Sequence, residues 1–146
     1  MTNKEKRALV LAARGAMRLA YAPYSGCRVG AALLTSGGRV YTGFNIENAA
    51  FTPTVCAERS AFIRALHEGE RDFAAIAVIG ENTRLPEAGG SFYPCGVCRQ
   101  FMREFCPPGL VILVADPSGE RFEELTLDAL LPHGFGPENV KGERRS

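Results

Sequence analysis

The sequence has no excess of charge of either sign, because 17 lysine and arginine residues are matched by 16 aspartate and glutamate residues, for a net charge of +1. A protein that binds a polyanion needs a basic patch to neutralise phosphates. The near-neutral balance therefore argues against a nucleic acid as the main partner. A short basic cluster, "KGERRS" at residues 141–146, is more typical of a solvated chain end.

Long hydrophobic runs are also lacking. Interior runs such as "LVILVA" at 110–115 are far shorter than the roughly 20 residues that cross a bilayer. Near the N-terminus, Arg14 interrupts a short apolar run whose residues recur at helical spacing, which predicts an amphipathic helix rather than a signal peptide. We therefore expect no membrane contact and a cytoplasmic, reducing location, in which the five cysteines are thiols or ligands rather than disulfides.

No repeat, low-complexity tract or linker divides the 146 residues, so we predict one domain over 1–146 with flexible ends at 1–7 and 141–146. After the N-terminal helix, "CRVGAALLT" and "VYTGFNI" flank a glycine turn and predict a β-hairpin. The later segments alternate between helix and strand character: a helix at 56–69, a strand at 73–80, a helix at 95–105, strands at 109–116 and 120–125, and a helix at 125–132. This order predicts an α/β domain of three layers, a mixed sheet with helices on both faces.

The stretch "YPCGVCRQF" contains Cys95 and Cys98 at Cys-x-x-Cys spacing, which suits a metal, a redox dithiol or two buried thiols. Cys56 lies one helix–strand–loop unit upstream, also at a predicted helix start. Right-handed α/β connectivity can bring the two helix N-termini together at one sheet edge. The three cysteines can then converge on one ion.

Three thiolates around Zn²⁺ leave a net charge of −1, which the free N–H groups of two helix N-termini help to offset. We expect Arg59 to add a charge-assisted hydrogen bond to sulfur, whereas Arg99 suits either this role or a surface ion pair. Neither His67 nor His133 is well placed as a fourth ligand. Three protein ligands leave one open position on tetrahedral zinc, as in catalytic sites.

Glu58 stands two residues after Cys56, in the first turn of the predicted helix. A glutamate there is often only a partner of the helix dipole. This one is also near enough to reach the open position of the metal. Zinc lowers the pKa of bound water to about 7, and a neighbouring carboxylate can carry the protons that hydrolysis moves.

"CAER" at 56–59 followed by "PCGVCRQ" at 94–100 resembles the signature of the zinc nucleoside and nucleotide deaminases. Three further segments are similar to the small homotetrameric cytidine deaminases, and the likeness runs from the first helix to Val140: "YAPYSGCRVGAALLT", "GFNIENAAF" and "LLPHGFGPENV". The resemblance implies an α-β-α sandwich with a mixed five-stranded sheet. It also implies one zinc per subunit, a tetramer with active sites shared between subunits, and the conversion of cytidine and deoxycytidine to uridine and deoxyuridine in pyrimidine salvage.

The resemblance also assigns the reacting groups. Cys56, Cys95 and Cys98 would bind zinc, with hydroxide as the fourth ligand. The hydroxide would attack C4 of cytosine while Glu58 protonates N3, and Glu58 would then carry the water proton to the departing ammonia.

By the same resemblance, Asn45 and Glu47 would hold the ribose hydroxyls. On an extended strand these two positions face the same side, so the residue pattern agrees. The Ala57 backbone would bind the base edge, and Phe135 would stack on the base in a neighbouring subunit's site, although a simple core or interface aromatic is the plainer alternative.

The sequence departs from the family pattern around the nucleoside pocket. Cys27 stands where phenylalanine is usual, and the loss of that ring could cost on the order of 1 kcal/mol. Phe51 replaces a common tyrosine, Tyr93 replaces a frequent serine, and the loop at 84–92 is longer than usual. These changes concern substrate fit rather than the metal or the proton chemistry.

Several other functions fit parts of the pattern. A relative acting on a modified cytosine nucleoside, such as a blasticidin-type drug, is favoured by Cys27, whereas the intact "NIEN" at 45–48 favours ordinary nucleosides. A structural zinc module would need four ligands, and three are found. A thiol oxidoreductase would leave Cys56 and Glu58 without a role. Editing of DNA or RNA is disfavoured by the neutral charge.

Overall fold

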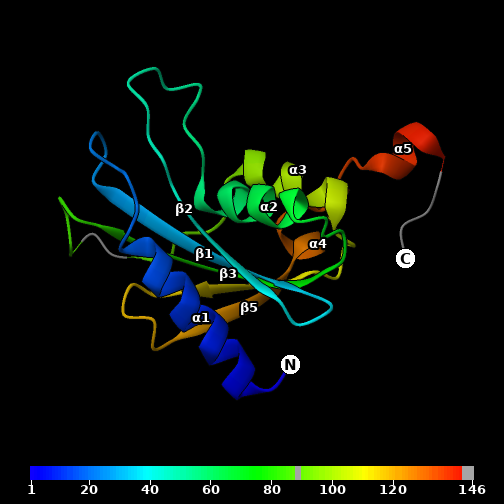
Figure 1. The fold of residues 1–146 in the computed structure, drawn as a ribbon, viewed down its shortest axis with the longest axis horizontal. Helices are drawn as coiled ribbons and strands as arrows, with labels where there is room; N and C mark the ends of the chain where they lie inside the picture. The colour runs from blue at the N-terminus through cyan, green and yellow to red at the C-terminus, as the bar shows by residue number, and fades with distance from the viewer. Residues whose placement is uncertain (88–89, 143–146) are drawn as a thin grey trace.

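The computed structural model describes residues 1–87 and 90–142. Within them a mixed five-stranded sheet has the order β2-β1-β3-β4-β5 (Figure 1). Its strands are β1 (Cys27–Thr35), β2 (Val40–Phe44), β3 (Phe73–Asn82), β4 (Val111–Ala115) and β5 (Phe122–Thr126). The β3–β4 pair is parallel and the other neighbouring pairs are antiparallel, so the predicted mixed sheet is confirmed.

Helices cover both faces of this sheet. They are α1 (Asn3–Met17), α2 (Ala57–His67), α3 (Gly96–Phe105), α4 (Leu127–Leu130) and α5 (Pro137–Lys141). Successive side chains of a strand point to opposite faces, so alternate residues of β1 and β3 build two separate cores. Ala31 and Val78 pack in the core under α2 and α3, whereas Ala32 and Ile79 pack in the core under α1. The three-layer arrangement is therefore confirmed.

The two ends of the chain differ from expectation in detail. Thr2 caps α1 in a reciprocal pair with Glu5, and residues 3–7, for which we expected a flexible end, form the first turns of that helix. The helix predicted at 125–132 is shorter because β5 continues through Thr126, whose side chain caps α4. The additional helix α5 was not predicted, and residues 143–146 of the expected flexible end lie outside the described residues.

None of the helices in the described part of the chain combines the length and apolar character that crossing a bilayer requires.

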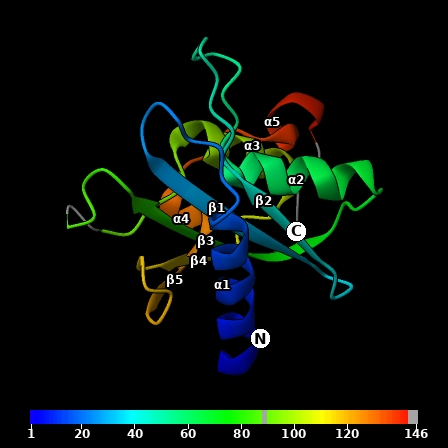
Figure 2. The same cartoon turned by 60° about the vertical axis from the view of Figure 1, so that its left-hand side comes forward.

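The helices α2 and α3 lie next to each other, and both begin at the same side of the sheet (Figures 1 and 2). Gly43 of β2 fixes the position of α2. A Cβ atom at this glycine would lie 2.4 Å from the Ala61 nitrogen and 2.5 Å from the Ala57 oxygen. The first turns of α2 therefore pack directly on the backbone of β2, which leaves no room for a side chain at residue 43.

We expect Gly43→Ala to lower the free energy of unfolding by about 1–3 kcal/mol, because the methyl group would push backbone atoms of α2 off the sheet. Denaturant unfolding measures this change. Gly15→Ala is the matched control: Gly15 lies in α1 with nothing within 4 Å of the added carbon, so alanine should leave stability unchanged or raise it by up to about 1 kcal/mol. Equal stabilities for the two variants would contradict the proposed packing.

Candidate active site

Three cysteine side chains meet where α2 and α3 begin. Cys56 is the N-cap residue of α2, Cys95 is the N-cap residue of α3, and Cys98 lies in the first turn of α3. Their three Sγ atoms lie within 4.8 Å of one another, and the Cys56 and Cys95 sulfurs are 3.9 Å apart. The convergence expected from the helix–strand–loop spacing is thus present.

The donor set fits one zinc ion. Zinc–sulfur bonds of about 2.3 Å in a tetrahedron place sulfurs about 3.8 Å apart, close to the 3.9 Å between Cys56 and Cys95. Neither of these N-cap side chains accepts a helix N–H, and all three cysteines are free thiols. The sulfurs are therefore left for another partner, and soft thiolates are ligands that zinc prefers.

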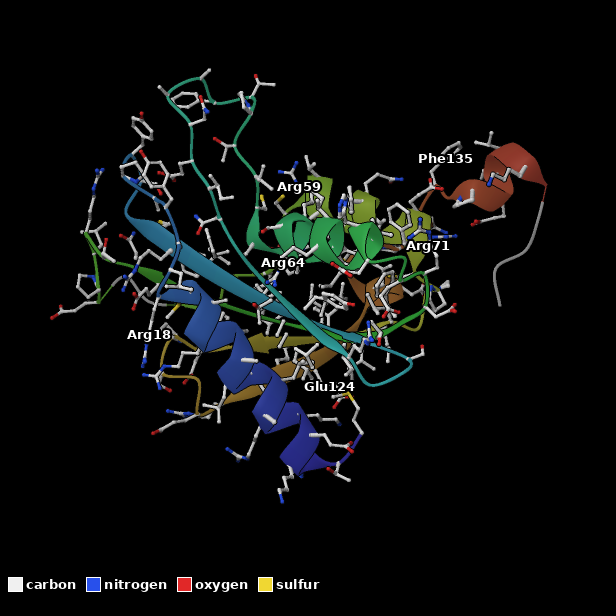
Figure 3. The ribbon with its side chains drawn as sticks, viewed as in Figure 1. Arg18, Arg59, Arg64, Arg71, Glu124 and Phe135 are labelled. Atoms are coloured by element: carbon white, nitrogen blue, oxygen red, sulfur yellow. The ribbon has the colours of Figure 1, made fainter. Side chains whose placement is uncertain are left out.

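The surroundings favour negative charge on the Cys56 sulfur. The Nη2 atom of Arg59 lies 3.4 Å from the Cys56 Sγ and 3.5 Å from the Thr54 carbonyl oxygen (Figure 3). A hydrogen bond from Cys98, together with the Arg59 guanidinium, lowers the pKa of the Cys56 thiol. The same hydrogen bond and burial raise the pKa of Cys98. Arg59 thus contacts sulfur as expected from the sequence.

Arg99 has a different role, which the sequence left open. Its Nε donates to the Pro94 carbonyl oxygen at 2.7 Å, and its Nη1 donates to the Leu130 carbonyl oxygen at 2.6 Å. These two bonds fasten the start of α3 to the end of α4. The guanidinium thereby supports the segment that carries Cys95, through backbone oxygens rather than through sulfur.

Glu58 is almost fully enclosed, with 4% of its surface exposed. Burial, and to a smaller extent the negative charge of Cys56, raises the pKa of this carboxyl to about 7. A carboxyl group with this pKa can both donate and accept a proton near neutral pH. Its place in the first turn of α2 puts it beside the thiols.

A cavity of about 190 Å³ opens onto Glu58 and the thiols of Cys56 and Cys95, whereas Cys98 is buried and does not border it. Four of the residues expected at the site border it besides Glu58: Cys56, Cys95, Ala57 and Asn45. Its apolar wall is built by Val29, Val55, Val78, Phe92 and Tyr93, of which the sequence indicated only Tyr93. These residues come from two strands and two loops, so no single motif contains them. The cavity therefore has a polar, proton-transferring side and an apolar side.

Asn45 and Glu47 are both held by backbone groups near the start of β1. The Asn45 side chain accepts from the Val29 nitrogen at 2.8 Å and donates to the Cys27 oxygen at 2.8 Å. Glu47 accepts from the nitrogens of Tyr24 at 2.9 Å and Ser25 at 3.1 Å, and from the Ser25 hydroxyl. Although burial opposes the effect, the hydrogen bonds from Ser25 and Tyr24 lower the pKa of Glu47.

These two residues border neighbouring hollows rather than one cavity. Asn45 borders the cavity at the thiols, whereas Glu47 borders a shallower one, and Thr54 borders both. The Glu47 Oε1 atom already accepts two hydrogen bonds, but Glu47 Oε2 and Asn45 Oδ1 each accept one and have a second lone pair, so both side chains can still accept a hydrogen bond. The two groups together can reach a ligand that extends from the thiols toward Glu47.

Three further residues expected at the site do not border the cavity at the thiols. Cys27 is half-buried at the start of β1, and Phe51 is 83% exposed in the projecting loop between β2 and α2. Phe135 is 60% exposed and lies beside α5, away from the sheet (Figure 3). Its carbonyl oxygen accepts from Gln100 of α3 at 2.9 Å, so its backbone is tied to the helix that carries Cys98.

The sequence model of the cytidine and deoxycytidylate deaminase zinc-binding region matches residues 3–114. A cytidine deaminase of Sporosarcina psychrophila is 41% identical over 132 residues, which are 90% of this chain and 92% of the relative. One from Halalkalibacterium halodurans is 42% identical over 137 residues, 93% of this chain and 98% of the relative.

Solved structures agree with these sequence matches. The crystal structure of cytidine deaminase from Burkholderia pseudomallei superposes with a TM-score of 0.80 at 42% identity, and the match covers 92% of this chain and all of that one. That from Mycobacterium tuberculosis gives 0.75 at 33% identity, covering 93% of this chain and 99% of that one.

A three-layer fold with a three-thiol centre at paired helix starts and a buried glutamate beside it defines a zinc-dependent deaminase. The chain belongs to the cytidine and deoxycytidylate deaminase family, whose cofactor is zinc.

We expect Arg59→Gln to lower zinc affinity by about 10- to 100-fold, because the guanidinium that donates to the Cys56 sulfur is lost. Competition with a chelator of known zinc affinity measures the change. Arg18→Gln removes the same charge from an exposed position at the end of α1 and should leave zinc affinity unchanged (Figure 3). Identical affinities for the two variants would exclude a role for Arg59 at the metal.

Proposed function

We propose that this chain catalyses the hydrolytic deamination of cytidine and deoxycytidine to uridine and deoxyuridine, releasing ammonia, as a step of pyrimidine salvage in the cytoplasm. The observation that carries the proposal is the buried carboxyl group of Glu58, which borders one cavity together with the Cys56 and Cys95 thiols. Relatives at 41% and 42% identity are cytidine deaminases, which supports the choice of substrate.

Cys56, Cys95 and Cys98 would hold the metal, one ion in each subunit. When bound, zinc lowers the pKa of a coordinated water to about 7 and so supplies a nucleophile at neutral pH. Arg59 and the two helix N-termini balance the negative charge of the thiolates. With the metal bound, this balance would help to keep the sulfurs ionised without a fourth protein ligand.

Glu58 would move the protons that the reaction requires. Hydrolysis adds water at C4 of cytosine and removes the amino group as ammonia, so N3 must gain a proton before the leaving nitrogen gains one. A carboxyl whose pKa is about 7 can donate to N3 and later deliver a proton to the leaving nitrogen. Enclosure in the cavity limits exchange of that proton with bulk water.

The nucleoside would lie between the thiols and Glu47. The Ala57 backbone would bind the base edge, and its position on the border of the same cavity as Glu58 supports this role. Asn45 and Glu47 would bind the ribose hydroxyls with the acceptor capacity that their backbone partners leave free.

We further propose a single domain over residues 1–146 that assembles as a homotetramer, with Phe135 of each subunit completing a neighbour's site. The support for this is the exposure of two large rings, Phe51 at 83% and Phe135 at 60%. Exposed aromatic surface of this kind is stabilised when it is covered by another chain. Phe51 would then contribute to the rim of the nucleoside site.

We expect Glu58→Gln to keep one zinc per chain and to lower the rate of cytidine deamination by about 10²- to 10⁴-fold, because the amide cannot exchange protons. Loss of cytidine absorbance gives the rate, and metal analysis of the purified protein gives the zinc content. Glu68→Gln makes the same change at the exposed end of α2 and should keep wild-type activity.

Two results would overturn the proposed function. A wild-type chain that holds one zinc and leaves both cytidine and deoxycytidine unchanged would exclude these substrates. A metal-free chain with full deaminase activity would exclude the role assigned to the thiols.

Tetramers assembled from two different variant subunits test whether each active site contains residues of two subunits. Phe135→Ala should raise the KM for cytidine about five- to tenfold, because a stacking ring is lost. Co-assembly with Glu58→Gln subunits should restore a fraction of sites with wild-type KM, since such a site combines one subunit's Glu58 with the other's Phe135. Val140→Ala, an exposed change in the same segment, is the control. If Phe135 acts within its own chain, no wild-type component will appear on mixing.

A further inference from the structure

We infer that Phe92 is a specificity-determining residue that supplies the aromatic wall for the cytosine base, in place of the ring missing at position 27. This inference rests on the proposed function, because it names the part of that site that holds the base. It accounts together for three features of this sequence: a small residue at Cys27, a glycine within β3 at Gly80, and a ring at Phe92.

Phe92 stands where a flat apolar ligand would need a wall. The half-buried ring borders the cavity that Cys56, Cys95 and Glu58 also border. The aliphatic groups on this side come from Val29, Val55 and Val78. A second ring, Tyr93, also borders the cavity, but its hydroxyl is tied to Glu123. Aromatic rings stack favourably on one another, so a pyrimidine is the kind of ligand that Phe92 suits.

The Phe92 ring packs directly on the backbone of Gly80. A Cβ atom at Gly80 would lie 2.4 Å from Cγ of Phe92 and 2.8 Å from each of its Cδ atoms. The backbone of Gly80 does not have a positive φ, so the strand conformation itself does not require glycine here. Glycine inside a strand marks a site where another group approaches closely. The approaching group is the Phe92 ring.

The register of β1 and β3 places Cys27 close to Gly80, on which the Phe92 ring packs. Val29 pairs with Gly80 and Cys27 pairs with Asn82. Opposed residues of an antiparallel pair share a face, so Cys27, Val29 and Gly80 all lie on the face covered by α2 and α3. Cys27 and Gly80 are diagonal neighbours, about 7–8 Å apart, within reach of an aromatic side chain. A phenylalanine at residue 27 would therefore compete with Phe92 for one volume.

The residues after Phe92 hold the loop in place. The Tyr93 hydroxyl donates to the Glu123 carboxylate on β5, so the phenol is tied to an outer strand. Pro94 is buried, and its carbonyl oxygen accepts from Arg99. Tyr93, which departs from the family pattern, thus anchors the loop that carries Phe92.

A ring that stacks on the base acts on binding and leaves the proton transfers unchanged. We therefore expect Phe92→Ala and Phe92→Leu to raise the KM for cytidine about tenfold, with kcat within twofold of wild type and one zinc per chain. Gly80→Ala should give the same pattern by displacing the ring. Leu85→Ala, an exposed change in the same loop outside the cavity lining, is the control and should keep wild-type kinetics.

The double variant Cys27→Phe with Phe92→Ala tests directly whether a ring at residue 27 can replace the ring at residue 92. We expect it to bring KM back to within about threefold of wild type, because the new ring enters the vacated volume. Cys27→Phe alone should raise KM, since two rings then compete. Calorimetric titration of cytidine into the same variants carrying Glu58→Gln gives the binding constants without turnover.

The outcomes separate this inference from the proposed function. A wild-type chain that does not deaminate cytidine overturns the proposed function and this inference with it. Active wild type with an unchanged KM in Phe92→Leu overturns only the role of Phe92. A folded, zinc-loaded double variant whose KM stays about tenfold high overturns the exchange between positions 27 and 92.

Discussion

The meeting of two helix N-termini at one edge of the sheet is the constraint on which the site depends. The bare backbone of Gly43 lets the first turns of α2 pack directly on β2, and α3 begins beside it. Three sulfurs gather there because two of the cysteines are N-cap residues and the third is one turn further on. The free N–H groups and Arg59 offset their charge, and Glu58 reaches the same cavity because it shares the first turn of α2.

The layers of the fold and the cluster of three thiols were predictable, because both follow from local sequence patterns. Alternating strand and helix segments gave the layers, and the position of each cysteine at a predicted helix start gave the convergence of the thiols. Helix α5 was missed, although Pro137 at its first position and Gly142 in the left-handed region after its end are recognised helix boundary signals. At five residues it is too short for periodicity to reveal.

The apolar half of the cavity was not predictable because it depends on the path of a loop across the sheet. Nothing in the spacing of Phe92 indicates that its ring lies on Gly80, and Val29 and Val78 read only as core strand residues. The contacts of Arg99 were not predictable for a similar reason. A long side chain after a ligand can turn toward sulfur or toward carbonyl oxygens, and the choice made here depends on Leu130, which is distant in sequence.

The clustering of the three thiols couples the metal to the integrity of the whole chain. An unfolded chain does not hold these sulfurs within 4.8 Å of one another, so the ion binds the folded form preferentially. By mass action, once the site is saturated, each tenfold rise in free zinc adds about 1.4 kcal/mol to the folded state. The fraction of chains that resist heat or proteolysis is therefore set partly by the concentration of free zinc in the surroundings.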